Sequence, residues 1–295
     1  MIVEQFLDLS RWTSMFLRDA PFRPREETIT ESLLVKITRD KLASSVVAKA
    51  SQGDESRRGH DWAWAIEAPA GWMNLMIQAK QISAESPARY KELGKDSARV
   101  QARKLIKAAR KARALPVYAL FNSDIDPFGA DGSLVTFGGC GLPWLSKNTF
   151  AVSPPWTSGQ SAMGVTLAAA SDIRDRVTSR TARSSHAVRV NEVAMPWECL
   201  FCPKWRPPVW DVEASQWPGI SRAAATLATH MRAEELEERV LRGPFPRWLS
   251  SAPPEWASAL QNQAPLDPDF PRETETTLPA GLPRNIGYAV VTRRG

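Results

Sequence analysis

The sequence of 295 residues has few cysteines and no long apolar run. Three cysteines are too few for a disulfide framework, and they indicate the reducing cytoplasm. No apolar run approaches the roughly 18 residues that a membrane-spanning helix needs. The residues from Met1 to Phe6 lack the basic and apolar regions of a secretory signal. We therefore expect a cytoplasmic protein without a membrane partner.

Several patterns of common enzyme classes are also missing. The sequence contains no Walker loop, no GxGxxG and no Ser-His-Asp pattern. Cys199 and Cys202 have the spacing of a zinc knuckle, but there is no second CxxC. Because this pair stands in a tryptophan-rich stretch, we interpret the two residues as buried thiols and predict no zinc site.

The overall composition is that of a globular protein with a sizeable core. Hydrophobic residues make up 43% of the chain and charged residues 24%, which excludes a disordered or fibrous protein. The length allows one large domain or two smaller ones. An excess of 38 Lys and Arg over 32 Asp and Glu favours a polyanionic partner.

Two aromatic-rich apolar runs, residues 62–67 and 72–77, predict a β-hairpin. The turn residues Ala68-Pro69-Ala70-Gly71 separate them. If Glu67 pairs with Trp72, the same register pairs Asp61 with Gln78.

This register gathers three polar side chains at one end of the hairpin. Directly opposed residues of an antiparallel pair share a face, with Cβ atoms about 5 Å apart. Side chains alternate along a strand, so Lys80 joins Gln78 and Asp61 while Ala79 points away. An acid, an amide and a lysine in one place indicate an active site.

The rest of the chain predicts an α/β fold with a mixed sheet flanked by helices. A capping box formed by Thr28 and Glu31 predicts that a second helix starts at Thr28. From 243 onward, frequent prolines predict mostly irregular structure over the core. The further expected elements are a helical region over 87–114, strands over 117–121 and 164–167, and a helix over 221–241.

The order helix, hairpin, helix, strand resembles the core of the PD-(D/E)xK nucleases, a restriction-endonuclease-like fold. The segment Ile77-Gln78-Ala79-Lys80 is most similar to the Gln-x-Lys variant of Mrr-like restriction endonucleases. The resemblance covers residues 25–125. It implies a nuclease domain over 1–180 and a Pro/Trp-rich C-terminal extension over 181–295 that packs on it. The whole chain resembles an uncharacterised bacterial family of this superfamily that is linked to phage defence.

The resemblance implies a role for each residue of the motif. Asp61 is the principal Mg²⁺ or Mn²⁺ ligand, since Mg²⁺ prefers oxygen ligands and takes one or two carboxylates. Lys80 orients or activates the attacking water and offsets developing charge. Glu27 resembles the helix-borne glutamate of many members and would be the second metal carboxylate. Gln78 departs from the usual carboxylate, because its amide oxygen can coordinate but adds no charge.

A helix rich in basic residues follows the hairpin. Between Val100 and Leu115 there are six basic residues and no acidic one. The alanines and Leu105 at helical spacing would face the core, which leaves the basic residues on exposed flanks to bind phosphates. Gln101 matches a helix position that packs toward the site in related nucleases. The expected nucleic-acid-binding residues are Gln101, Arg103, Lys104, Lys107, Arg110 and Lys111.

These patterns predict a Mg²⁺-dependent endonuclease that acts on DNA in bacterial anti-phage defence. Gln78 keeps an alternative open, a degenerate nuclease fold that binds nucleic acid or a partner without cleaving. An RNase with the same residues is a third reading. A second copy of the chain or a partner protein of a defence system also stays open.

Overall fold

The computed structural model describes the two N-terminal helices, the sheet and the helices that cover it. The described residues are 2–39, 46–49, 60–68, 71–82, 90–94, 96–122, 164–178, 193–201, 249–261 and 288–292. The predicted helix over 221–241 and Cys202 lie outside these ranges, so the structure does not test either prediction.

A mixed sheet of eight strands forms the centre of the described fold. The strands follow one another across the sheet in the order β1-β8-β2-β3-β4-β5-β6, and β7 pairs with the beginning of β3. Their bounds are Val46–Lys49 (β1), Trp62–Ala68 (β2), Gly71–Gln81 (β3), Leu115–Phe121 (β4), Val165–Ala169 (β5), Ala194–Pro196 (β6), Leu249–Ser250 (β7) and Tyr288–Thr292 (β8). The sheet is mixed because β8 lies parallel to β2, and β4 parallel to β3, while the hairpin is antiparallel.

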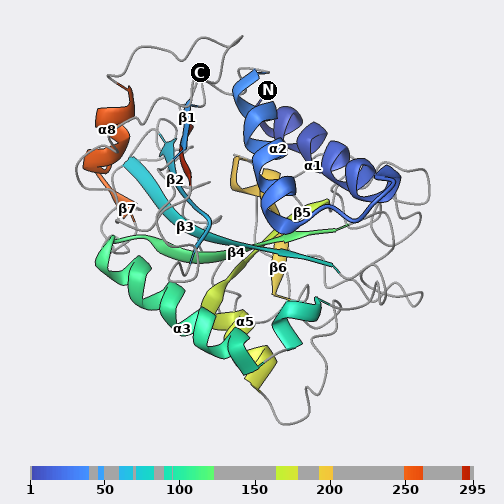
Figure 1. The fold of residues 1–295 in the computed structure, drawn as a ribbon. Coiled ribbons are helices and arrows are strands. Elements are labelled where there is room, and N and C mark those ends of the chain that lie inside the picture. Colours follow the sequence, from blue (N-terminus) through green and yellow to red (C-terminus); the bar gives the residue numbers. More distant parts are fainter. Residues whose placement is uncertain are drawn as a thin grey trace, which may run out of the picture.

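Helices cover both faces of the sheet (Figure 1). On one face lie α1 (Ile2–Asp19) and α2 (Glu26–Arg39), and on the other α3 (Asp96–Lys111) and α5 (Ala170–Thr178). The strand residues divide accordingly, since Ile77 and Val117 pack in the first layer and Met76 and Leu120 in the second. The predicted α/β class with a helix-flanked mixed sheet is therefore confirmed. Smaller elements are the 3₁₀ helices η3 (Lys91–Gly94) and η6 (Trp197–Phe201), and α8 (Glu255–Gln261).

The hairpin has the predicted register. Glu67 lies opposite Trp72, and Trp62 lies opposite Ile77. The pairing extends one step further than predicted, to Ala68 and Gly71, which shortens the loop. A Cβ on Gly71 would lie 2.5 Å from the carbonyl oxygen of Ser250 in β7, so only glycine fits where the two strands meet.

An aromatic cluster fills the layer under α1 and α2. Phe6 stacks on Phe201 at 4.2 Å between ring centroids and contacts Trp197 edge-on at 4.8 Å. The Trp64 indole donates a hydrogen bond to Thr292 Oγ1 at 2.9 Å, which ties β2 to the last described strand. Aromatic groups of this kind contribute large buried areas and directional contacts.

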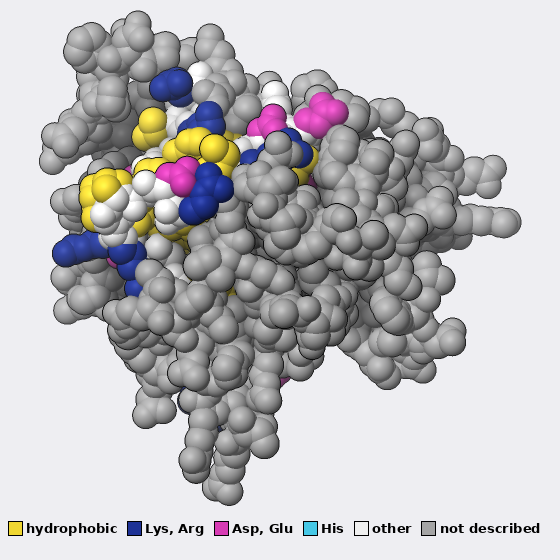
Figure 2. Space-filling model, turned by 90° about the vertical axis from the view of Figure 1, so that its right-hand side faces the viewer, with side chains coloured by type: hydrophobic (Ala, Val, Ile, Leu, Met, Phe, Trp, Pro, Cys, Tyr) yellow, Lys and Arg dark blue, Asp and Glu magenta, His cyan; other side chains and the backbone are white. Residues whose placement is uncertain are grey.

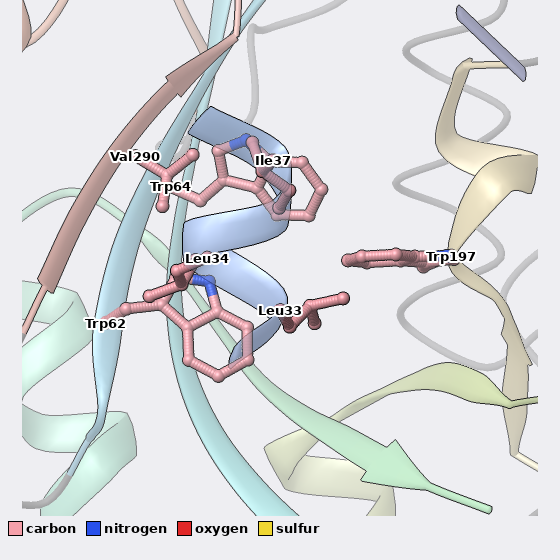
Figure 3. A pocket seen from close by; sticks show the side chains of 7 residues that line it. All are labelled: Leu33, Leu34, Ile37, Trp62, Trp64, Trp197 and Val290. Carbon is pink, nitrogen blue, oxygen red and sulfur yellow. The ribbon is translucent and has the colours of Figure 1, made fainter. Parts of the chain in front are cut away.

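A small cavity lies between this cluster and α2. Figure 3 shows that its lining is apolar, with Leu33, Trp62 and Trp197 among the seven side chains. Its volume of about 10 Å³ is near the minimum for a single water molecule. The cavity is therefore a packing gap in the core and has no room for a substrate.

The C-terminal residues belong to the same sheet as the predicted nuclease domain. Strand β8 lies between β1 and β2, and β6 forms the opposite edge next to β5. The predicted division at residue 180 therefore falls inside one sheet, and the described part of 181–295 supplies strands to it as well as packing on it. Sequence order gave no sign of this long-range pairing.

Two of the predicted boundaries need correction. Helix α2 begins at Glu26, because the Arg25 carbonyl accepts a hydrogen bond from the Ile29 N–H at 3.1 Å. Thr28 and Glu31 thus lie inside the helix and do not form a capping box. The predicted region over 87–114 contains η3 and α3, and the strand predicted over 117–121 starts two residues earlier.

Among the described helices, none is long and apolar enough to cross a membrane.

Candidate functional site

Asp61 and Gln78 contact each other at the open end of the hairpin, as their register predicts. The Gln78 Nε2 group donates to both oxygens of the Asp61 carboxylate, at 3.1 and 2.9 Å. The backbone N–H of Ala79 donates to Asp61 Oδ2 at 2.6 Å. The Asp61 N–H itself donates to the Ile77 carbonyl at 2.7 Å, so its backbone is part of the ladder. These contacts hold the carboxylate in one orientation.

Lys80 lies on the same face and forms an ion pair with α2. Its Nζ is 3.0 Å from Glu26 Oε2, and the Gln81 N–H donates to the other oxygen of Glu26 at 3.1 Å. The Lys80 side chain is only 4% exposed and that of Glu26 20% exposed, so water screens this pair poorly. Arg23 also donates to the Ile82 carbonyl at 3.2 Å, which fixes the approach to α2 against the end of β3.

The α2 carboxylate that pairs with Lys80 is Glu26, whereas the sequence pattern favoured Glu27, whose charge also acts on Asp61. Glu27 is exposed and lies one position further along the helix, and the ion pair with Lys80 belongs to Glu26. Acidic residues in a first helical turn are favoured by the helix dipole, so two adjacent glutamates after Pro24 signalled the helix start.

The environment of Asp61 favours its protonated form. Burial raises the pKa of Asp61 to about 7, against the lowering effects of the Ala79 N–H and the Lys80 charge. The nearby carboxylates of Glu26 and Glu27 raise the pKa further. The charges of Glu26, Glu27 and Lys80 therefore all act on Asp61, and a buried carboxylate with acidic neighbours gains from a bound cation.

The donor set fits Mg²⁺ or Mn²⁺ held with several waters. The carboxylates of Asp61 and Glu26 and the amide oxygen of Gln78 are oxygen ligands of the kind that Mg²⁺ prefers, and one or two carboxylates suffice. No cluster of three or more His, Cys, Asp or Glu suited to a metal occurs within the ranges that the structure describes. The fit thus depends on two carboxylates, an amide and water.

Tyr118 completes this face of the sheet, and the sequence gave no reason to single it out. In the parallel register of β3 and β4 it lies beside Gln78. Burial raises the pKa of Tyr118, and the charges of Asp61 and Glu26 raise it further. Its phenol is therefore neutral.

Helix α3 presents its apolar side to the sheet and its basic residues to the outside. Ala98, Ala102, Leu105 and Ala109 are buried, as their spacing predicts. The exposed basic residues are Arg99, Arg103, Lys104, Lys107, Arg110 and Lys111 on the helix and Arg113 just after it. The chain passes from the end of β3 through α3 to the start of β4, and Asn74 Nδ2 donates to the Ala112 carbonyl at 3.1 Å near the start of β3.

The beginning of α3 therefore lies toward the site and its end lies away from it. At about 1.5 Å per residue, Arg103 is roughly 10 Å and Lys111 roughly 22 Å along the helix from Asp96. Gln101 is half-buried on α3, and the polar contacts that join Asp61, Gln78, Lys80 and Glu26 do not include it.

The side of the molecule on which α1 ends carries mixed charge. Figure 2 shows basic, acidic and hydrophobic side chains of the described residues next to one another there. Phe22, which follows α1, is 70% exposed, and Arg18 is paired with Asp19 at 2.6 Å. In contrast, the outer side of α3 bears basic residues without acidic ones between Val100 and Leu115.

One of the two cysteines with knuckle spacing can be placed. Cys199 is a buried residue of η6, in the same apolar layer as Trp197.

Comparison with known proteins gives a family match and nothing more specific. Residues 3–288 match the model of DUF6615, described as a family of unknown function. No curated protein and no solved structure matches the chain.

Proposed function

We propose that this chain, which belongs to the DUF6615 family, is a metal-dependent nuclease of the PD-(D/E)xK type that hydrolyses phosphodiester bonds of DNA in bacterial anti-phage defence. The observation that carries the proposal is the presence of two polar pairs at one end of the hairpin. Gln78 donates to Asp61 at 2.9 and 3.1 Å, Lys80 pairs with Glu26 at 3.0 Å, and the charges of Lys80 and Glu26 act on Asp61.

In this proposal, Asp61 and Glu26 hold the cation and Gln78 assists through its amide oxygen. Bound Mg²⁺ or Mn²⁺ would polarise the phosphate and make a water nucleophilic at neutral pH. Ala79 N–H and Gln78 Nε2 keep the Asp61 carboxylate oriented, so little reorganisation is needed when substrate arrives.

Lys80 would act on the phosphate. Its ammonium group is nearly buried, and a charge in such a place interacts more strongly with a developing negative charge than a solvated one does. Glu26 positions this ammonium group at 3.0 Å. The exposed basic residues of α3 would bind the DNA backbone further from the reacting phosphate, with counterion release as the main source of affinity.

The test is a cleavage assay with plasmid, single-stranded DNA and RNA, in Mg²⁺, in Mn²⁺ and in EDTA. Lys80→Met should lower kcat by about 100-fold or more, the usual cost of removing a group that stabilises transition-state charge. Glu26→Gln should lower kcat/KM at least about tenfold. Its matched control is Glu27→Gln, the same change one residue along the helix. Cleavage that is independent of metal, or equal in the wild type and Lys80→Met, would contradict the proposal, and cleavage of RNA alone would assign an RNase.

The second candidate is a degenerate nuclease fold that binds nucleic acid or a partner. It is favoured by the amide of Gln78, which adds no charge, and by the pairing of Lys80 with Glu26, which leaves the site internally satisfied. Calorimetric titration separates the two candidates. A degenerate protein would show no binding of Mg²⁺ or Mn²⁺ and no cleavage, yet would retain salt-dependent binding to DNA.

A further inference from the structure

The hydroxyl group of Tyr118 is buried on the face of the sheet that carries the candidate site. Tyr118 is fully buried, and its register partner in β3 is Gln78, whose amide donates to Asp61. Paired residues of neighbouring strands stand on the same face, so the phenol and the Gln78 side chain lie side by side.

This hydroxyl has no hydrogen-bond partner among the residues that the structure describes. Buried tyrosine hydroxyls usually find one, because an unmade hydrogen bond of a desolvated group destabilises the fold. A buried donor beside a polar site therefore indicates a partner that is a water molecule or a ligand.

Two carboxylates of the candidate site act on this phenol and are the acceptors that a bridging water could bind. Burial is the main cause of the raised pKa of the phenol, and the charges of Asp61 and Glu26 raise it further. The phenol therefore remains a neutral donor. The two carboxylates come from the residue before β2 and from the first turn of α2, and they contact the Ala79 N–H and the Lys80 ammonium group near the end of β3.

A second buried tyrosine shows the contrast. Tyr90, which is also fully buried, donates its hydroxyl to Asn122 Oδ1, just after the end of β4. Both tyrosines pack in the layer between the sheet and α3. Only one of them has its hydroxyl satisfied by a described side chain, and the other is the one beside the candidate site.

We propose that Tyr118 is a positioning residue, whose hydroxyl donates a hydrogen bond to a water molecule held by the carboxylates of Asp61 and Glu26. This inference rests on the proposed nuclease function and deepens it. The hydrogen bond would fix the water beside the cation ligands and maintain the carboxylates in a geometry that binds the cation.

The test compares Tyr118→Phe with the matched control Tyr90→Phe in the full chain. Three quantities are measured: the Kd of Mn²⁺ by calorimetry, kcat/KM on the cleaved substrate, and the urea midpoint of the metal-free protein. Loss of an outer hydrogen bond at a metal site typically costs about 10- to 100-fold in affinity or activity. Tyr118→Phe should therefore weaken Mn²⁺ binding and kcat/KM by that factor, with a urea midpoint that is equal or lower. Tyr90→Phe should lower the midpoint and change the Mn²⁺ Kd by less than about twofold, because its hydroxyl bonds to Asn122.

Two results would overturn the inference. One is a Tyr118→Phe protein with the Mn²⁺ Kd and kcat/KM of the wild type. The other is a raised urea midpoint, which would mean that the hydroxyl had no partner. A wild type that neither binds Mn²⁺ nor cleaves refutes the proposed function instead. In that case the metal-free comparison still decides, since a lowered midpoint supports a hydrated Tyr118 and a raised one excludes it.

Discussion

The raised pKa of Asp61 predicts that Asp61→Asn stabilises the metal-free protein at high pH and not at low pH. Asparagine has nearly the same shape, keeps an oxygen for the Ala79 N–H and cannot ionise. The carboxyl group of wild-type Asp61 must instead lose its proton in a buried site next to Glu26.

The sign and size of this change in stability follow from proton linkage. The pKa of Asp61 is 3.8 without the protein environment and about 7 in the folded protein. Between these values the unfolded chain binds fewer protons than the folded one, so stability falls as the pH rises and levels off above about 7. At 1.36 kcal/mol per pH unit the full loss is about 4 kcal/mol. Because Asp61 is partly accessible to water, we expect a loss of stability of about 2–4 kcal/mol.

The assay is urea unfolding of both proteins in EDTA at pH 5 and pH 8. About a third of the loss already occurs below pH 5, so the advantage of Asp61→Asn over the wild type should grow by about 1.5–3 kcal/mol between pH 5 and pH 8. Glu67→Gln is the matched control, since Glu67 lies on the same strand face about 20 Å away at 3.3 Å per residue. An equal stability difference at both pH values would refute the reasoning.

Three further predictions concern the core and the basic helix. Gly164→Ala should destabilise the protein by about 2–3 kcal/mol in urea unfolding, because a Cβ there would overlap the Ser10 carbonyl of α1; an unchanged midpoint would contradict this close approach. Trp64→Phe should lower the free energy of unfolding by about 3 kcal/mol in the same assay, because it leaves a cavity among the rings and removes the hydrogen bond to Thr292. A decrease below about 1 kcal/mol would contradict this prediction. Lys104→Ala should reduce the slope of log K against log salt for duplex DNA by about 1 in fluorescence anisotropy, whereas Arg39→Ala on α2 should leave it unchanged.

The hairpin and α3 could be predicted because their signals are local. Two apolar runs joined by a short turn with Pro and Gly pair in the register that the turn sets, and this register places Asp61 opposite Gln78. The spacing of Ala98, Ala102 and Leu105 likewise fixes the buried side of α3.

The features that could not be predicted from the sequence depend on contacts between distant parts of the chain. Glu26 and Glu27 are adjacent, and only the packing of α2 against the end of β3 decides which one pairs with Lys80. Tyr118 follows from the parallel pairing of β3 with β4, which a crossover through α3 creates. The β-branched and aromatic residues of 288–292 favour a strand, but no local pattern places that strand between β1 and β2.

The position of β8 sets the order in which the sheet can be completed during synthesis. Strand β2, which begins directly after Asp61, has β3 on one side from early in translation, but its other neighbour is made more than 200 residues later. Chains fold from the N-terminus as they emerge. Any nascent or truncated chain that ends before residue 288 therefore leaves an open strand edge beside the candidate site, and the edge closes only when the last strand of the sheet is added.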